Sequence, residues 1–203
     1  MIETAQIFTF LFLMLGPFKI VVPFAHMTMQ SDPKFTRKLA VWATLFSLAA
    51  LAVAVLLGNS VLIKFGIPVP ILAMTGGLIL FLVALLNIIR QFSPSEPKEE
   101  KDSPATSYMA IIPLAFPNIV TPHGMAAVIV FVAISPDLHG KLIIGAILVG
   151  IMLVNLVFML LTRSLIKVFA IILPILGAIL GVIQVALGLH IIYNQVIALM
   201  AMN

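Results

Sequence analysis

Two short polar motifs interrupt long apolar stretches of this sequence: GPFK at residues 16–19 and TPHG at residues 121–124. A proline inside a helix removes a backbone hydrogen bond and clashes with the preceding turn. A glycine or threonine followed by proline is also typical of a helix start. Each motif therefore predicts a break at which a new half-helix begins, although a simple kink in a continuous helix is the alternative.

Such breaks could hold an anion. The first amides of a helix have no partner within the helix and form the positive end of its dipole. Two helix starts that face each other would therefore bind a carboxylate. The absence of a side chain at Gly124 would let a ligand approach the backbone. The predicted donors are the amides of Phe18, Lys19, Ile20, His123, Gly124 and Met125.

Two side chains in these motifs could act directly on a substrate. A cation at midspan costs roughly 3 kcal/mol or more unless it is paired or hydrated, and no Asp or Glu lies in the core of the apolar stretches. Lys19 is therefore expected to bind a substrate carboxylate or to take the place of a coupling cation; the alternative is that it extends to a membrane interface. His123 could carry a proton for coupling, or stay a neutral, hydrogen-bonded residue at the break.

Two amide side chains complete the candidate site. Asn118 is expected to satisfy a backbone carbonyl freed at Pro117, or to line the pocket. Gln184 lies on one helix face with glycines at 177, 181 and 188, where it could reach a substrate amine or bridge two helices. This glycine stripe favours packing within the chain, with a dimer face as the alternative. The full predicted substrate-binding set is Gly16, Pro17, Phe18, Lys19, Asn118, Thr121, Pro122, His123, Gly124 and Gln184.

The elements that must position these residues are membrane-spanning helices. Of the 203 residues, 63% are hydrophobic and only 9% are charged, against about 25% charged in soluble domains. The composition predicts an all-α membrane protein. The first and fourth of its spans would contain the breaks, and a short interfacial segment is expected at 166–172. The six stretches long enough to span are 4–28, 39–63, 69–90, 108–134, 141–162 and 172–199.

Residues 91–107 divide the chain into two similar halves. They are rich in Pro, Ser and both charges, which predicts a flexible cytoplasmic linker between a first three-helix repeat (1–90) and a second one (108–203). Eight of the eleven Lys and Arg residues lie in three alternate connections, which predicts that those connections are cytoplasmic and both termini periplasmic. The repeats are then inverted, a pattern that points to a transporter.

The same chain offers no signal for other chemistry. It has no cysteine and no H-E-x-x-H, G-x-S-x-G or Walker motif, so neither an enzyme, a metal site nor a cofactor is expected. The pI near 9.6 follows from the loop residues that orient the helices, so nucleic acid is not expected as a partner. The expected partners are a small-molecule substrate and the lipid bilayer. A coupling ion, proton or sodium, and a homo-oligomer are left open.

Two stretches resemble signatures of the MarC family of bacterial inner-membrane proteins, also called small neutral amino acid transporters. They are FGIPVPILAMTGGLILFLVALL (65–86) and PLAFPNIVTPHGMAAVIV (113–130), and the resemblance covers essentially the whole chain. The resemblance implies six spans with inverted repeats and a place in the lysine-exporter (LysE) superfamily. It also implies ion-driven transport of glycine, alanine and similar amino acids across the inner membrane.

The sequence departs from this family at the breaks. The family usually has Asn-Pro where this chain has Gly16-Pro17, a small or apolar residue at the position of Lys19, and Gly-Pro-Gly at 121–123. The framework therefore carries over, whereas the substrate and the coupling ion do not. One hypothesis is that Lys19 makes transport independent of a coupling cation or favours a more acidic substrate.

Two functions are consistent with these features. The leading one is a secondary transporter, an exporter or ion-coupled symporter, of small neutral amino acids or similar small carboxylates. Half-helix N-termini at midmembrane would hold the substrate carboxylate. The alternative is a non-transporting membrane structural or assembly protein with kinked helices. Stabilisation by substrate would separate the two, because a ligand that binds the native state raises its stability.

Overall fold

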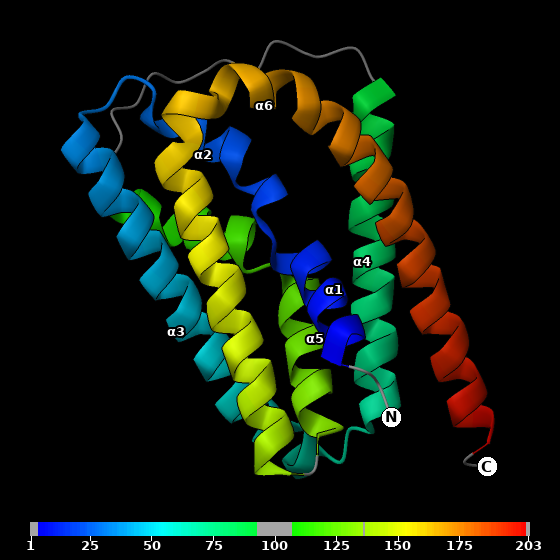
Figure 1. The fold of residues 1–203 in the computed structure, drawn as a ribbon. Coiled ribbons are helices and arrows are strands. Elements are labelled where there is room, and N and C mark those ends of the chain that lie inside the picture. The colour runs from blue at the N-terminus through cyan, green and yellow to red at the C-terminus, as the bar shows by residue number, and fades with distance from the viewer. Residues whose placement is uncertain (1–3, 93–106, 136, 202–203) are drawn as a thin grey trace.

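The protein is a bundle of helices (Figure 1). The computed structural model describes residues 4–92, 107–135 and 137–201, and within these ranges there are helices and connections but no strand. The prediction of an all-α protein is therefore confirmed for this part of the chain. In chain order the elements are α1 (Thr4–Leu15), η1 (Pro17–Lys19), α2 (Val21–Thr28), α3 (Pro33–Phe65), α4 (Val69–Phe92), η2 (Ser107–Ala110), η3 (Ile111–Ile119), α5 (Pro122–Ala133) and α6 (Leu138–Met200).

Helix α6 covers two of the predicted spans. It is helical over 63 residues, and it bends over at one end of the bundle so that its two parts run in opposite directions (Figure 1). We call these parts the first limb (Leu138–Ser164) and the second limb (Ile175–Met200). At its start, the Gly140 amide donates to Asp137 Oδ2 at 3.0 Å. This hydrogen bond lowers the pKa of the exposed Asp137 carboxyl below its ordinary value.

The described helices are those of an integral multi-pass membrane protein. Four segments are long and apolar enough to cross a bilayer: parts of α3 and α4, and the two limbs of α6. A fifth is formed if the pair Tyr108–Ile119 and Pro122–Ala133, bent by 65°, is one broken span. The first apolar stretch is divided into α1, η1 and α2, none of which spans alone, so the number of six spans stays a prediction.

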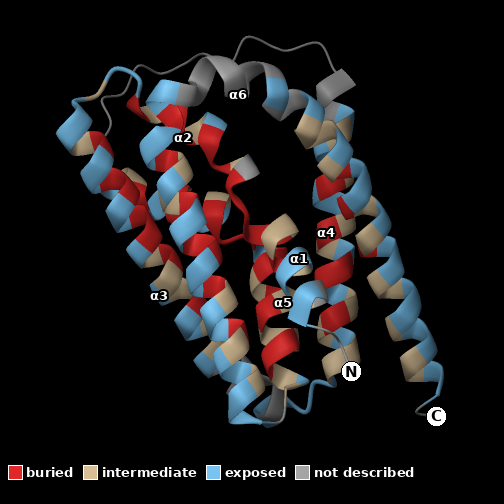
Figure 2. Ribbon diagram, in the orientation of Figure 1, coloured by how far each residue is buried: buried red, intermediate tan, exposed pale blue. Residues whose placement is uncertain are grey.

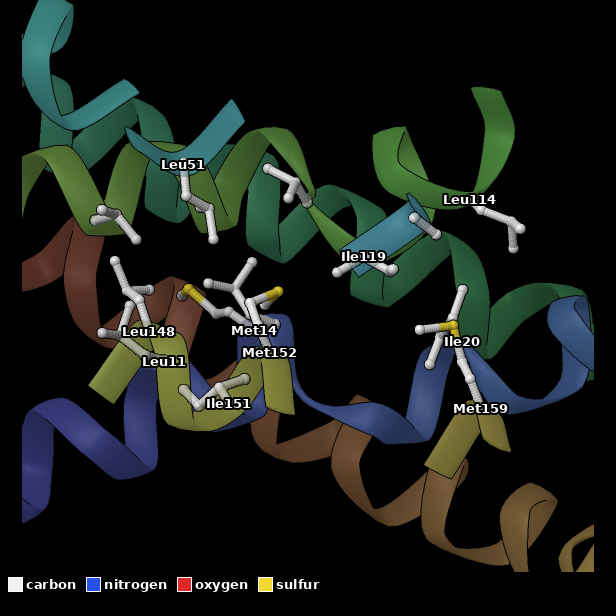
Figure 3. Close-up of a cluster of buried hydrophobic side chains, with 14 of the residues drawn as sticks. Leu11, Met14, Ile20, Leu51, Leu114, Ile119, Leu148, Ile151, Met152 and Met159 are labelled. Atoms are coloured by element: carbon white, nitrogen blue, oxygen red, sulfur yellow. The ribbon is translucent and has the colours of Figure 1, made fainter. Parts of the chain in front are cut away.

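The interrupted segments lie inside the bundle. Figure 2 shows buried residues on the inward faces of the helices and exposed residues on the outward faces. Around the two interruptions, Leu15, Ile20, Ile119 and Val120 are each no more than 2% exposed. Figure 3 shows residues of α1 and Ile20 near side chains of the first limb. This cluster of buried side chains includes Leu11, Met14, Ile20, Leu148, Ile151, Met152 and Met159.

Arg163 connects three elements at one end of the bundle. Its Nη2 donates to Thr28 O at 2.8 Å, to Ser31 O, and to Thr36 Oγ1 at 3.0 Å. The guanidinium thereby caps the carbonyl end of α2, where a cation is favourable. This is the end at which α4 finishes and α6 bends, while α4 and α6 both begin at the opposite end (Figure 1).

Two glycines allow α4 and the second limb to pack backbone against backbone. A Cβ on Gly188 would lie 2.8 Å from Gly77 O and 2.8 Å from the Phe81 amide nitrogen. Gly181 is also tight, because a Cβ there would lie 3.1 Å from Ile88. At Gly177 a Cβ would meet nothing within 4 Å. The glycine stripe therefore packs within the chain at 181 and 188, as its spacing favoured, and does not pack at 177.

This contrast predicts opposite effects of two equivalent substitutions. Gly188→Ala should destabilise the protein by about 1–3 kcal/mol, because the new methyl group overlaps backbone atoms that cannot move aside. Gly177→Ala should leave stability unchanged or raise it by up to about 1 kcal/mol, because alanine favours the helix. Unfolding of both variants by SDS titration in detergent measures the difference. Equal stability of the two variants would contradict the close packing of α4 and α6.

Candidate functional site

The first break is a full interruption of the helix. Helix α1 ends at Leu15, and Gly16 is extended with φ −73° and ψ 172°. Pro17 then begins a single 3-10 turn, and α2 begins only at Val21. The kink alternative is therefore wrong here. A helical turn does begin at Pro17 with Gly16 at its N-cap, as predicted, but it is a 3-10 turn and the α-helix starts only at Val21. An α-helix from Pro17 would lack a hydrogen bond to Lys19 O, because Pro23 has no N–H to donate.

The second break begins a proper helix. Val120 and Thr121 are extended, and α5 starts at Pro122 with Thr121 as its cap. Thr121 Oγ1 accepts the Gly124 amide at 3.1 Å, and Thr121 O accepts the Met125 amide at 2.9 Å. The prediction of a helix start at Thr121-Pro122 is confirmed, and the kink alternative is wrong at this break as well.

Three side chains, two from α6 and one from η1, lie at the carbonyl end of α1. Pro17 has no N–H and Gly16 leaves the helix, so the carbonyls of residues 13–15 lose their helical partners. Gln184 Nε2 donates to Leu13 O at 2.9 Å, and Asn155 Nδ2 donates to Leu15 O at 2.7 Å. Lys19 Nζ lies 3.5 Å from Met14 O. Asn155 therefore links the first limb to the end of α1, and of the two roles predicted for Gln184 the structure shows the bridge between helices.

The two breaks meet at Lys19 and His123. Lys19 Nζ lies 3.4 Å from His123 Nε2, and Thr121 Oγ1 lies 3.0 Å from the same nitrogen. An ammonium has only donors to offer, so in the tautomer that pairs with a charged Lys19 the Nε2 atom accepts and Nδ1 carries the ring proton. His123 is 2% exposed, and Nδ1 is buried with no hydrogen-bond partner among the residues that the structure describes. Lys19 therefore extends to the second break rather than to a membrane interface.

Three of the six predicted amide donors already have partners. The Ile20 amide donates to Pro17 O at 3.2 Å, and the Gly124 and Met125 amides are held by Thr121. Glycine at 124 makes room for another side chain rather than for a ligand, since a Cβ there would lie 2.6 Å from Leu15 Cδ2. The prediction that these amides are free is therefore wrong for three of the six.

A cavity of about 570 Å³ adjoins this meeting point. It lies between α1, α4, α5 and the second limb. Its inner end is at Met14 and His123, and it extends toward the start of α4 and the ends of α5 and α6. Its wall is mostly apolar. The lining residues are Phe10, Met14, Val69, Pro70, Ala73, Gly76, Gly77, His123, Ala126, Ala127, Val130, Phe131, Ile134, Leu187, His190, Ile191, Asn194 and Gln195.

Of the predicted site residues whose side chains the structure describes, one lines the cavity and the others lie outside its wall. His123 lines the cavity, whereas Gly16, Pro17, Lys19, Thr121, Pro122, Gly124 and Gln184 are not among the lining residues. Asn118 makes no hydrogen bond from its side chain within the described ranges and does not line the cavity either. The side chain of Phe18 lies outside what the structure describes.

Sequence reasoning missed the polar residues near the mouth of the cavity. His190 lines the cavity, and its Nε2 lies 3.0 Å from Asn194 Nδ2. The two residues are four apart and therefore lie on one helix face. This spacing was the only signal in the sequence that could have placed them together.

Comparison with known proteins identifies the family. The model of the MarC family, described as MarC family integral membrane protein, matches residues 1–200. The chain belongs to the MarC family. Its resemblance to this family, inferred from residues 65–86 and 113–130, is thus confirmed.

Three relatives of this MarC family protein are membrane proteins from an archaeon and a bacterium. It is 30% identical to UPF0056 membrane protein MJ1677 of Methanocaldococcus jannaschii, over 93% of each chain. It is 24% identical to UPF0056 membrane protein MJ0972 of the same organism, over 95% of this chain and 86% of the relative. It is 27% identical to UPF0056 inner membrane protein YhgN of Escherichia coli, over 68% of each chain. No solved structure matches.

The capping of α1 predicts an effect on stability that is specific to one asparagine. Asn155→Leu should destabilise the protein by about 1–3 kcal/mol, because Leu15 O would be left buried without a donor. Asn87→Leu is the matched control: Asn87 is exposed on α4, so its replacement should leave stability unchanged within about 0.5 kcal/mol. Thermal unfolding of the two variants in detergent would decide. A stable Asn155→Leu variant would show that this cap is dispensable.

Proposed function

We propose that this MarC family protein is a secondary transporter of small carboxylate-bearing solutes, the class that includes small neutral amino acids. The observation that carries the proposal is the meeting of two buried breaks at the inner end of a cavity, where Lys19 Nζ lies 3.4 Å from His123 Nε2. An anion at the inner end of the cavity would lie beside His123, whose buried Nδ1 has no partner among the described residues, and in the field of one ammonium.

The backbone supports this reading. In a membrane, irregular backbone is tolerated only where protein buries it or where it lines a water-filled cavity. Both breaks lie within the buried core. Side chains there hydrogen-bond backbone groups that the interruptions leave without helical partners. Paired broken helices at the interface of two inverted halves are the usual place for a transporter site. We propose that α1 to α4 and η2 to α6 are these two halves, with six spans in all.

The two ends of the bundle differ in the way that alternating access requires. The cavity extends to the end where α4 begins, whereas at the opposite end Arg163 ties the first limb to α2 and α3. The distribution of Lys and Arg favours the Arg163 end as cytoplasmic and both termini as periplasmic. In this arrangement the cavity is open toward the periplasm of the inner membrane, and opening of the Arg163 contacts would release the substrate inward.

Transport in liposomes tests the proposal. Purified protein should take up small amino acids or small carboxylates saturably, and His123→Leu should lower uptake about tenfold or more, because a buried donor to the anion is lost. His139→Leu, at an exposed residue at the start of the first limb, should retain uptake. Absence of both uptake and thermal stabilisation across a broad panel would favour the alternative, a structural or assembly protein.

The absence of cysteine from the sequence allows a clean test of orientation. Ala127→Cys, in the cavity wall, should react with a membrane-impermeant maleimide added to spheroplasts. Gln30→Cys, exposed in the connection between α2 and α3, should react only after the membrane is permeabilised. Labelling of Gln30→Cys in intact spheroplasts would reverse the proposed orientation, and failure of Ala127→Cys to react would contradict a cavity open to the periplasm.

A further inference from the structure

We propose that the substrate is an apolar monocarboxylate without an amino group, because Lys19 already occupies the place that a substrate ammonium would take. The inference rests on the proposed function, since it assigns the substrate class of the same site. The proposed substrate is a carboxylic acid with a branched or linear apolar body.

The acceptors that an ammonium would need are already engaged. In sites built from broken helices, freed backbone carbonyls at a helix C-terminal end hold cations. Here the C-terminal end of α1 offers the carbonyls of Leu13, Met14 and Leu15. Gln184 and Asn155 donate to the outer two, and the ammonium of Lys19 lies at the middle one. Lys19 is itself an alkylammonium at the end of a helix dipole, which is the position that an amino acid's own ammonium would favour.

The charge of the site also favours a substrate without an ammonium group. The sequence has no Asp or Glu within residues 4–31, 33–95, 103–136 or 138–203. Of the acidic residues that the structure describes, Asp32 and Asp137 are both exposed at the ends of helices. The field at the inner end of the cavity is therefore that of a single positive charge. A monoanion would neutralise it, whereas a zwitterion would bring a second ammonium beside Lys19, and like charges repel.

The cavity fits a carboxylate at one end and an apolar body at the other. His123 lines the inner end of the cavity; in the tautomer that pairs with Lys19 its buried Nδ1 is a donor with no partner among the described residues, and Lys19 lies beside the opposite nitrogen. A hydrogen bond from such a donor to a carboxylate is charge-assisted and strong. Beyond it the wall includes Phe10, Phe131 and Leu187. The volume of about 570 Å³ is within the range of small-molecule sites.

A matched pair of ligands tests the inference in the full-length protein. Leucine and 4-methylpentanoate have the same carbon skeleton and differ only in the amino group, as do alanine and propanoate. In detergent, 4-methylpentanoate should raise the midpoint of thermal unfolding, since it binds the native state, and leucine should not. In liposomes, uptake of 4-methylpentanoate should exceed that of leucine about tenfold or more.

Removal of the internal ammonium should reverse this preference. In Lys19→Ala the site loses its positive charge and Met14 O becomes free, so leucine should now stabilise the protein and 4-methylpentanoate should not. Lys64→Ala, at an exposed lysine at the end of α3, should behave as the unaltered protein. If Lys19→Ala does not fold, the comparison of the two ligands on the unaltered protein and on Lys19→Arg still decides, because both should prefer the carboxylate.

The outcomes separate the two proposals. If leucine and alanine stabilise the unaltered protein as well as their amino-free partners do, the monocarboxylate inference is wrong and the transporter proposal stands. If no carboxylate and no amino acid stabilises the protein or is taken up, both proposals fall.

Discussion

A backbone carbonyl that loses its helical partner inside a lipid bilayer must find another donor, and much of this fold depends on how α1 meets that requirement. Gly16 and Pro17 end α1 in the middle of the bundle, where water cannot replace the missing N–H groups. Three side chains supply donors to the carbonyls of residues 13–15. Two of them come from α6, one from each limb. The bend of α6 therefore places one amide side chain on each side of α1.

The backbone groups freed at the two breaks find their hydrogen-bond partners in different ways. As a result, segments far apart in the sequence depend on one another. At the second break the local backbone suffices: the Val120 amide donates to Ala115 O at 2.9 Å, and Thr121 caps α5. At the first break the donors Asn155 and Gln184 lie 140 and 171 residues further along the chain than their acceptors. The native end of α1 therefore depends on α6, the last helix of the described chain.

The sequence predicted what depends on local chemistry and missed what depends on packing. Proline with a capping residue correctly located both interruptions, and Thr121 caps α5 as its type suggested. The length of η1 could not be predicted from Gly16-Pro17 alone, because it also depends on Pro23, which has no N–H to donate to Lys19 O. The cavity wall could not be predicted at all. Residues such as Phe10 and Leu187 line it, yet in the sequence they resemble every other apolar residue of a span.

The electrostatics of Lys19 link stability to occupancy. Among the described residues its ammonium has two polar contacts, Met14 O at 3.5 Å and His123 Nε2 at 3.4 Å, and both are at the long end for hydrogen bonds. A cation in such a place costs roughly 3 kcal/mol or more unless it is paired or hydrated, so without an anion this part of the bundle bears an electrostatic cost. An anion that binds beside His123 lowers that cost, and by linkage the same free energy appears as affinity for the anion. In the proposed transporter, the folded protein would therefore attract the anion before binding, and the apolar wall would select the shape of the ligand's body.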